Sequence, residues 1–544
     1  MTSKFTPSNA PSRLRSAGAS LSTGTTTLTE RAAVGIAALL EFRLFVANAI
    51  LWQTQCSCER NIIFVSPLRN DGPPRCREGS RLAFAATMTT PTADRNRWPN
   101  PLYGWYVTLT LLLAYTFSFV DRQVLNLLVE PIQADLGLSD TQISLLQGLA
   151  FVFTYVALSV PIGRMVDRFN RVAIMIGGVL VWSATTVACG LSRSFEQLFA
   201  ARLGVGAGEA TVTPASWSLL SDYFPPERLS RPISVYLMGP YIGGGMAMIA
   251  GATVLDWTEQ AGEIALPLVG ALAPWQFTFI AVGLPGLLIA ALLLTVREPE
   301  RKNRERVEAP PWRDVVGFLR RHWRIYLSLH LGVPCIVVML YGLQGWVPTV
   351  MVRVYGWELA EVGRIYGIIA LVAGSAGVLT GPTVARLLER RGHADQALPI
   401  AAFSAIAAAA SLALLPWQAS PYAALGCVFA ASFFVTLPLA LMTSAIQLAT
   451  PNDMRGVVSG LYVVTTNVIG LGLGPTLVAG ATDYVFADPK AVAYSLAIVS
   501  WVMGPLAAGL LLSGHRAYRE RLRALRLRQS ERVSGQPGSQ PARG

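Results

Sequence analysis

Twelve long apolar runs between Gly104 and Ser513 constrain the fold of this chain more than any other feature of its sequence. Each run is long enough to cross the hydrocarbon core of a bilayer as a helix, which takes about 20 residues. Charged residues make up only 14% of the 544 residues, whereas a typical soluble protein carries about a quarter. The sequence therefore predicts an all-α membrane protein. The expected transmembrane helices are Gly104–Leu128, Thr141–Gly163, Val172–Leu191, Leu198–Leu220, Pro232–Leu255, Trp275–Val296, Ile325–Val352, Ile365–Ala385, Ala397–Trp417, Tyr422–Leu448, Gly456–Thr482 and Ala491–Ser513.

The loops between these runs alternate in their content of basic residues. One set is rich in arginine, and the other set carries only Arg193, Arg353, Arg364 and Lys490. Basic loops are retained in the cytoplasm, so both termini are expected there, in a multi-pass protein of a cell membrane, with the bacterial inner membrane as the expected location. The net charge of +12 then reflects membrane topology, and we expect membrane lipids and no nucleic acid as partners.

The chain divides into five expected parts. Residues 1–87, whose start is rich in Ser and Thr, are expected to be a disordered or artefactual extension. Residues 88–297 and 324–514 each carry six apolar runs and are expected to form an N-terminal and a C-terminal six-helix bundle. Residues 298–323 are expected to form a cytoplasmic linker, and residues 515–544 a basic cytoplasmic tail. A Gly-Pro pair recurs at Gly239-Pro240 and Gly474-Pro475, which favours two repeated halves, as in many secondary transporters.

Charged residues interrupt two of the apolar runs. Arg202 and Glu209 lie in the fourth run, and Asp121 and Arg122 lie in the first. Charges inside a membrane are costly and usually face a bundle interior or a water-filled path. Adjacent helical residues point about 100° apart, so Asp121 and Arg122 need other partners. A static ion-pair network that fixes the helix register is the alternative to a functional site.

Several motifs resemble those of one family. The stretch from Gly163 through Asp167 and Arg168 to Arg171 resembles the loop motif between spans two and three of the major facilitator superfamily, with Asn170 where glycine is usual. The second copy of this motif, at residues 381–386, has lost its aspartate. Arg202 with Gly206 and Gly208 resembles the arginine-bearing motif of span four, and Gly239-Pro240 with Gly243 and Gly244 resembles the span-five motif of antiporters.

A narrower resemblance rests on Phe119, Asp121 and Arg122 together with Arg202 and Glu209. This combination is similar to the Spinster branch, whose members are associated with the export of sphingolipids or lysophospholipids. The resemblance implies twelve transmembrane helices in two six-helix bundles and transport by alternating access, with spans one and four lining a central cavity.

The resemblance also implies roles for individual residues. Asp121, paired with Arg202, and Glu209, approached by Arg122, would couple transport to protons. Arg122 and Arg202 would hold an anionic head group, because arginine offers a planar fork suited to phosphate or carboxylate. A lipid-like tail would lie on Tyr115, Phe119 and Tyr341, for which ordinary packing is the alternative. The expected gating residues are Gly163, Asp167, Arg168, Arg171 and Arg455, and the expected helix-packing residues are Gly239, Pro240, Gly243 and Gly244.

The sequence thus predicts a monomeric secondary transporter that is not an enzyme, that uses a proton gradient and no cofactor or metal, and that exports a small amphiphilic or anionic compound. A proton symporter that imports a small organic anion is one alternative, and a lipid sensor that does not transport is another. The sequence has no nucleotide-binding P-loop motif, which disfavours an ATP-driven pump.

Overall fold

The computed structural model describes residues 98–225, 228–261, 264–266, 270–301, 311–391, 395–451 and 454–534. The expected N-terminal extension, residues 1–87, lies outside these residues. Within them, 11 helical segments are long and apolar enough to cross a membrane, and they coincide with eleven of the twelve predicted spans.

The remaining predicted span, the fourth, is built from two shorter helices. These are α7 (Phe195–Glu209), of 15 residues, and α8 (Val212–Tyr223), of 12 residues. At the break between them the hydroxyl of Thr211 donates a 2.8 Å hydrogen bond to the carbonyl oxygen of Gly208. Such a bond from Thr to the preceding turn competes with the helical ladder and bends helices. Together the two helices have the length of one span.

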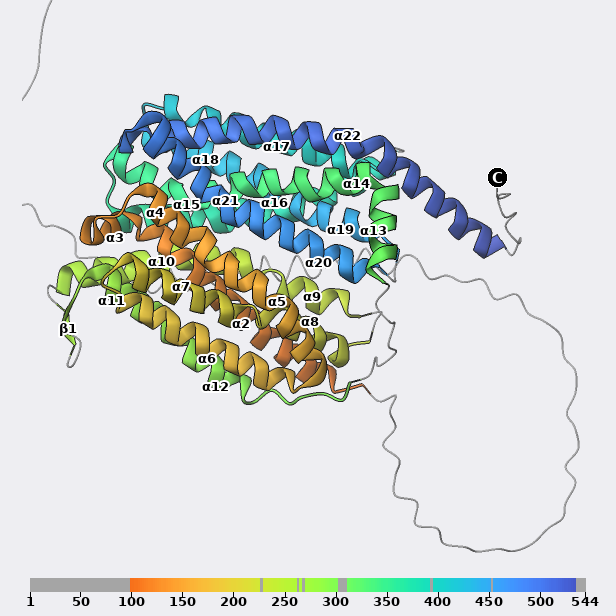
Figure 1. The fold of residues 1–544 in the computed structure, drawn as a ribbon, viewed down its shortest axis with the longest axis horizontal. Coiled ribbons are helices and arrows are strands. Elements are labelled where there is room, and N and C mark those ends of the chain that lie inside the picture. The colour runs from red at the N-terminus through yellow and green to blue at the C-terminus, as the bar shows by residue number, and fades with distance from the viewer. Residues whose placement is uncertain are drawn as a thin grey trace, which may run out of the picture. The chain divides into compact units, whose positions relative to one another are not determined.

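The helices before the linker form an N-terminal bundle (Figure 1). Their ends carry ordinary start signals, such as a Pro in the first turn of α2, α11 and α12, whose bounds follow. Besides α7 and α8, the bundle contains α2 (Pro101–Leu127), α3 (Val129–Leu136), α4 (Asp140–Ser144), the π-helix η1 (Leu145–Leu149), α5 (Ala150–Arg168), α6 (Arg171–Gly190), α9 (Ser230–Tyr236), α10 (Gly239–Ala261), the antiparallel strands β1 (Ile264–Leu266) and β2 (Gly270–Leu272), α11 (Pro274–Gly283) and α12 (Pro285–Leu293).

The helices after the linker form a C-terminal bundle. It contains α14 (Trp323–Leu327), the π-helix η2 (Ser328–Gly332), α15 (Val333–Tyr355), α16 (Leu359–Arg390), α17 (Ala397–Ala413), η3 (Leu415–Trp417), α18 (Pro421–Thr436), α19 (Leu439–Ala449), α20 (Arg455–Thr465), the π-helix η4 (Thr466–Leu471), α21 (Gly472–Gly480), the π-helix η5 (Ala481–Phe486), η6 (Pro489–Ala491) and α22 (Val492–Ser534). Helix α22 continues unbroken beyond His515, so the first part of the expected tail is helical.

Helix α13 (Trp312–Arg321) of the linker runs across the ends of the neighbouring spans (Figure 1). We call this end of the bundles the linker side and the other end the opposite side. The sequence assigns the linker side to the cytoplasm. Helix α13 is the helix that the sequence predicted within Trp312–Trp323. Its contact with a membrane surface stays a prediction.

Two glycine contacts bring the bundles together. A Cβ atom added to Gly245 of α10 would lie 2.8 Å from the carbonyl oxygen of Gly367 on α16, and a Cβ added to Gly367 would lie 2.8 Å from that of Gly245. Gly148 of η1 lies similarly close to the carbonyl oxygen of Leu471, where η4 meets α21. Only glycine allows backbones to approach this closely.

Candidate functional site

The first and fourth spans bring all four predicted charged residues into the interior of the N-terminal bundle. Arg202 is 0% exposed, Asp121 and Glu209 are 2% exposed, and Arg122 is 7% exposed. Helix α2 carries Asp121 and Arg122, whereas α7 carries Arg202 and Glu209. Buried charges at this depth require partners, because the desolvation of each ion costs several kcal/mol.

Arg122 and Glu209 form a direct ion pair, as expected. Nη2 of Arg122 lies 2.5 Å from Oε2 of Glu209. The guanidinium carbon of Arg122 also lies 4.0 Å from the ring centre of Phe151 and 4.4 Å from that of Phe119. These are cation–π distances. Arg122 is thus held by one carboxylate and by aromatic faces from two helices.

Arg202 is held differently from the expected pairing with the carboxylate of Asp121. Its Nε donates to the carbonyl oxygen of Leu146 at 3.2 Å, and its Nη1 donates to the backbone carbonyl oxygen of Asp121 at 3.4 Å. The arginine therefore approaches the backbone of α2 and not the end of the aspartate side chain. Oδ1 of Asp121 has no hydrogen-bond partner among the described residues.

The site retains further hydrogen-bonding capacity. Within the described part of the chain, Oε1 of Glu209, Nη2 of Arg202 and Nε of Arg122 are also buried without a hydrogen-bond partner. Most buried polar atoms in proteins are paired, and leaving one unpaired costs about 1–3 kcal/mol. The cluster therefore has free capacity to bond to a proton or a polar group.

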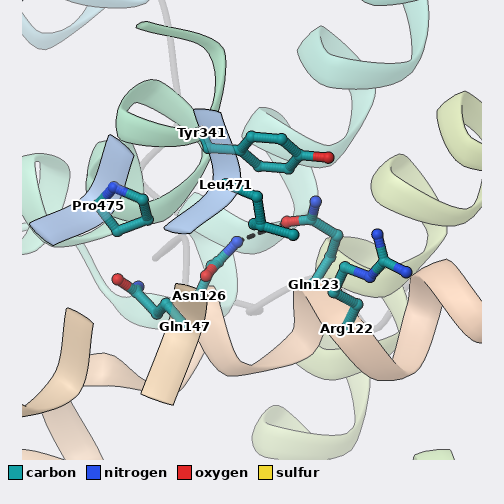
Figure 2. Close-up of a pocket in the computed structure, with 7 residues that line it drawn as sticks. All are labelled: Arg122, Gln123, Asn126, Gln147, Tyr341, Leu471 and Pro475. Atoms are coloured by element: carbon teal, nitrogen blue, oxygen red, sulfur yellow. Dashed lines mark hydrogen bonds between the residues drawn. The ribbon is translucent and has the colours of Figure 1, made fainter. Parts of the chain in front are cut away.

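A small cavity opens beside Arg122, between the two bundles (Figure 2). Its volume is about 10 Å³, which is room for about one water molecule. Tyr341, predicted as a contact for substrate, does line it. The other lining residues are Gln123, Asn126, Gln147, Leu471 and Pro475.

Sequence reasoning missed the three amides of this cavity. Gln123 and Asn126 follow Arg122 on α2, and Gln147 lies in η1 of the second span. Gln123 donates to Gln344 at 2.9 Å, and Gln147 donates to the carbonyl oxygen of Gly345 at 3.2 Å, so both reach the C-terminal bundle. The signal available in the sequence is the spacing of Arg122 and Asn126, which places a second polar group one turn from the charge.

The predicted tail contacts Tyr115 and Phe119 pack within the N-terminal bundle. Tyr115 stacks on Tyr236 with ring centres 4.6 Å apart, and Phe119 meets it edge-on at 5.4 Å. Tyr115 also lies against Gly239, and Phe119 against Gly243. Gly239 and Gly243 thus let α10 approach α2, whereas Pro240 and Gly244 line a second cavity and a Cβ added to Gly244 would meet nothing within 4 Å.

The predicted gating residues lie on the linker side and are not gathered at one contact. Arg171 is buried and joins Glu298 at 2.6 Å and Asp222 at 2.5 Å, so it ties α6 and α8 to the start of the linker. Asp167 is exposed, and Arg301 of the linker donates to its backbone carbonyl.

The other gating candidates have local surroundings. Arg168 is exposed, and Gly163 has open space around it. Arg455 donates a hydrogen bond to the carbonyl oxygen of Thr450, at 3.5 Å, and its side chain has no other hydrogen bond among the residues that the structure describes. The gating role of this group stays a prediction.

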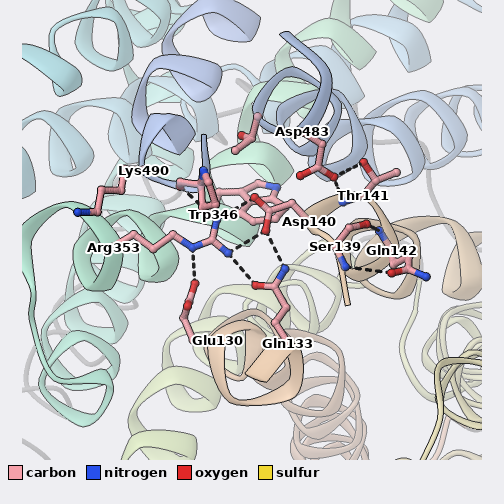
Figure 3. A network of polar contacts seen from close by, with 12 residues as sticks. Glu130, Gln133, Ser139, Asp140, Thr141, Gln142, Trp346, Arg353, Asp483 and Lys490 are labelled. Carbon is pink, nitrogen blue, oxygen red and sulfur yellow. Dashed lines mark hydrogen bonds and ion pairs between the residues drawn. The ribbon is translucent and has the colours of Figure 1, made fainter. Parts of the chain in front are cut away.

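A network centred on Arg353 joins the bundles on the opposite side (Figure 3). Its Nε lies 2.6 Å from Glu130, and its two terminal nitrogens lie 2.8 Å from the two carboxylate oxygens of Asp140. Gln133 accepts a further bond from Arg353 at 2.7 Å. Nearby, both the backbone nitrogen and the hydroxyl of Thr141 bond to Asp483.

The distribution of charge in the sequence contains a pattern from which this network could have been predicted. Arg353 is one of few basic residues in a set of loops that otherwise carries acids such as Glu130 and Asp140. The hydrogen bonds and ion pairs formed between the bundles by the described residues run from the central cavity to this side. The structure is therefore closed on the opposite side.

These features define a class of protein: a membrane protein in which two helix bundles face each other across a central site with buried charges. Residues 111–475, more than half of the chain, match the model of the Major Facilitator Superfamily, and the chain belongs to this superfamily. It is therefore a secondary transporter with a small transported substrate, and not an enzyme, as predicted.

The relatives confirm the resemblance to the Spinster branch. The chain is 25% identical over 443 residues to Protein spinster homolog 1 of Xenopus tropicalis, covering 76% of this chain and 81% of the relative. It is 27% identical over 429 residues to an MFS-type efflux pump of Mycolicibacterium smegmatis, covering 76% of this chain and 92% of that pump.

Solved structures confirm the fold. A bacterial homolog of the human lysosomal transporter Spinster, in an inward-facing and unoccupied conformation, superposes with a TM-score of 0.62 at 26% identity. The match covers 78% of this chain and 98% of that structure. A D-xylose–proton symporter with 15% identity and a TM-score of 0.56 shares the fold alone. The all-α fold with twelve spans predicted from the sequence is thus confirmed.

Proposed function

We propose that this chain exports an amphiphilic, lipid-like compound with an anionic head group in exchange for protons. The observation that carries the proposal is the buried quartet in which Arg122 and Glu209 are paired while the carboxylate of Asp121 has an oxygen without a partner among the described residues. Arg122 also lines the central cavity, which must widen beyond the space for one water molecule before a head group can reach it.

The sign of the coupling depends on which group the substrate displaces. A cationic group of a zwitterionic substrate competes with a proton for the carboxylate of Asp121, and competition for one site produces exchange. An anionic group that takes Arg122 from Glu209 instead leaves a buried carboxylate without its counter-ion, which then takes up a proton. That second order of events produces cotransport.

The free Oδ1 of Asp121 favours exchange, because Arg202 bonds to the backbone of this residue and leaves this oxygen without a partner among the described residues. The similarity to an efflux pump supports the direction of export. The closed opposite side agrees with the inward-facing conformation of the bacterial Spinster homolog, if the linker side faces the cytoplasm as the arginine distribution predicts.

A proton symporter for a small organic anion is the second candidate. The chain is 24% identical over 321 residues to a probable galactarate/D-glucarate transporter of Bacillus subtilis, covering 53% of this chain and 66% of that protein. Two buried arginines suit a dicarboxylate as well as a phosphate. The aromatic surroundings of Arg122 favour the amphiphile.

The test uses purified protein in liposomes that contain a pH-sensitive dye. The probes are lysophosphatidylethanolamine and sphingosine phosphate as zwitterions, lysophosphatidylglycerol and glucarate as anions, and a cationic drug. We expect the zwitterions to drive proton movement in the direction opposite to their own. Asp121→Asn and Glu209→Gln should abolish this movement, whereas the exposed control Asp256→Asn should retain it.

Three other results would each contradict one part of the proposal. Normal coupling in both variants means that these carboxylates do not carry the proton. Glucarate and protons that move in the same direction identify the importer. Binding of a lipid without movement of lipid or protons identifies a sensor.

A further inference from the structure

A second cavity, of about 30 Å³, lies between α10 and the C-terminal bundle. Tyr241 of α10 lines one side, and Leu340, Leu343 and Gln344 of α15 line another. Tyr366 of α16 and Ser432 of α18 complete the wall. The cavity thus draws on four helices that the proposed proton site does not use.

Two hydroxyl groups in this wall have unused hydrogen-bonding capacity. Tyr366 is 1% exposed and Ser432 is 4% exposed. Neither the phenol of Tyr366 nor the hydroxyl of Ser432 has a hydrogen-bond partner among the described residues. Buried hydroxyls are normally paired, and here both line the same cavity. Such groups suit a ligand that brings its own donor or acceptor.

The lining of this cavity is uncharged. Its described lining residues are aliphatic, aromatic, hydroxyl-bearing or amide side chains and glycines, with no acid or base among them. The cavity beside Arg122, in contrast, contains a permanent cation. A charged head group therefore belongs beside Arg122, and an uncharged polar group belongs beside Tyr366 and Ser432.

One hydrogen bond joins the two cavities. Gln344 lines the second cavity and accepts a 2.9 Å bond from Gln123, which lines the first. On α15, Tyr341 lines the first cavity and Leu340 and Gln344 line the second. A ligand that occupies both cavities would pass this amide pair.

We propose that the second cavity is a subsite for the uncharged hydrogen-bonding part of an amphiphilic substrate, such as the hydroxyl group between head and chain of a lysolipid. The hydroxyls of Tyr366 and Ser432 bind that group, and the charged head lies beside Arg122. This proposal rests on the proposed function, because it assigns a second binding region to the same substrate.

The test compares two probes in purified protein. One is lysophosphatidylethanolamine with its free hydroxyl, and the other is the 2-deoxy analogue, which has the same head and chain without the hydroxyl. We expect wild-type protein to bind the first about 3- to 10-fold more tightly, as expected for one net hydrogen bond. The double variant Tyr366→Phe with Ser432→Ala should bind the two probes equally.

Tyr462→Phe is the matched control, since Tyr462 is a buried tyrosine of the same bundle that lines neither cavity. It should keep the wild-type preference. Equal binding of both probes by wild-type protein overturns the subsite and leaves the proposed function intact. A preference that survives in the double variant overturns it as well. Absence of binding by either probe overturns the subsite together with the proposed substrate class.

Discussion

At the scale of single residues, Arg122 combines a buried ion pair with access to a cavity. It pairs with Glu209, lies against the rings of Phe119 and Phe151, and still reaches the central cavity. Arginine remains protonated under all relevant conditions, so a change in charge at this site must come from a carboxylate. Under the proposed function, Arg122 is therefore the fixed charge around which protons and substrate exchange.

Removal of Glu209 should destabilise the protein strongly. Glu209→Ala leaves the guanidinium of Arg122 buried without its counter-ion, and the loss of one partner of a buried pair typically costs about 3–5 kcal/mol. We expect this fall in the free energy of unfolding, measured by denaturation in bicelles.

The control is Asp256→Ala, which breaks the pair of Asp256 with Arg364, whose side chains are 43% and 47% exposed. Exposed pairs contribute about 0–1 kcal/mol. Equal losses of stability in the two variants would contradict the prediction that the buried pair of Arg122 with Glu209 stabilises the protein more than an exposed pair does.

The sequence predicted the identity of the four buried charges but only part of their pairing. The resemblance to the Spinster branch implied that Arg122 approaches Glu209, and the structure contains this pair. The resemblance did not show that Arg202 would bond to backbone carbonyls of Asp121 and Leu146, because the depth of one helix against another depends on side chains from a third. The position of Gln147 at the cavity could not be predicted either, because a single amide in an apolar run forms no pattern with its neighbours.

At the scale of elements, α7 is fixed by glycines that face its neighbours. A Cβ added to Gly208 would lie 2.6 Å from the carbonyl oxygen of Gly178 on α6, and Gly206 faces the backbone of Phe151 on α5. The small residues let α7 sink between α5 and α6, which places Arg202 and Glu209 against α2. The arginine-bearing motif thus has a packing function in addition to its charge.

Gly208→Val should therefore disturb both stability and site. The added methyl groups must push α7 away from α6, and such overpacking costs about 1–3 kcal/mol. We expect a loss of this size in bicelle denaturation, together with reduced proton-coupled transport.

Gly177→Val, on the same helix as Gly178 but with open space around it, should change stability by less than about 0.5 kcal/mol. A harmless Gly208→Val would contradict the close contact of α6 with α7.

The lengths of the apolar runs predicted where the transmembrane helices lie. Packing against neighbouring helices determines where those helices are interrupted. The fourth span breaks near Thr211, and the second, seventh and eleventh contain π-helical turns. No composition signal marks these positions, because a π-helical turn depends on neighbours that accept its widened backbone. The helical continuation of α22 past His515 was likewise hidden by its arginine-rich sequence.

At the scale of the whole molecule, Arg353 holds the two bundles together on the opposite side. Arg353→Gln removes its ion pairs with Glu130 and Asp140, and hydrogen bonds to charged groups contribute about 1.5–3 kcal/mol each. We expect the conformation that is open on the opposite side to gain population by about 10-fold or more.

The measurement is the labelling rate of Gln147→Cys, in a protein without native cysteines, by a membrane-impermeant thiol reagent applied from the opposite side. Arg364→Gln is the control, because it also removes a pair between the bundles but an exposed one, and its rate should change by less than about twofold. An unchanged rate in Arg353→Gln would contradict the assignment of Arg353 as a contact that keeps this side closed.

The contact of Gly245 with Gly367 has a consequence for how this transporter can diverge. Where the two glycines meet, α10 can move against α16 without breaking a side-chain hydrogen bond, whereas the exposed ion pair of Asp256 with Arg364 joins the same two helices at another point. The polar contacts of Arg353 then add resistance to opening, about three helical turns along α15 from Tyr341, which lines the central cavity. The rate of turnover and the choice of substrate can therefore be changed by separate mutations, one at Arg353 and others at the residues that line the cavities.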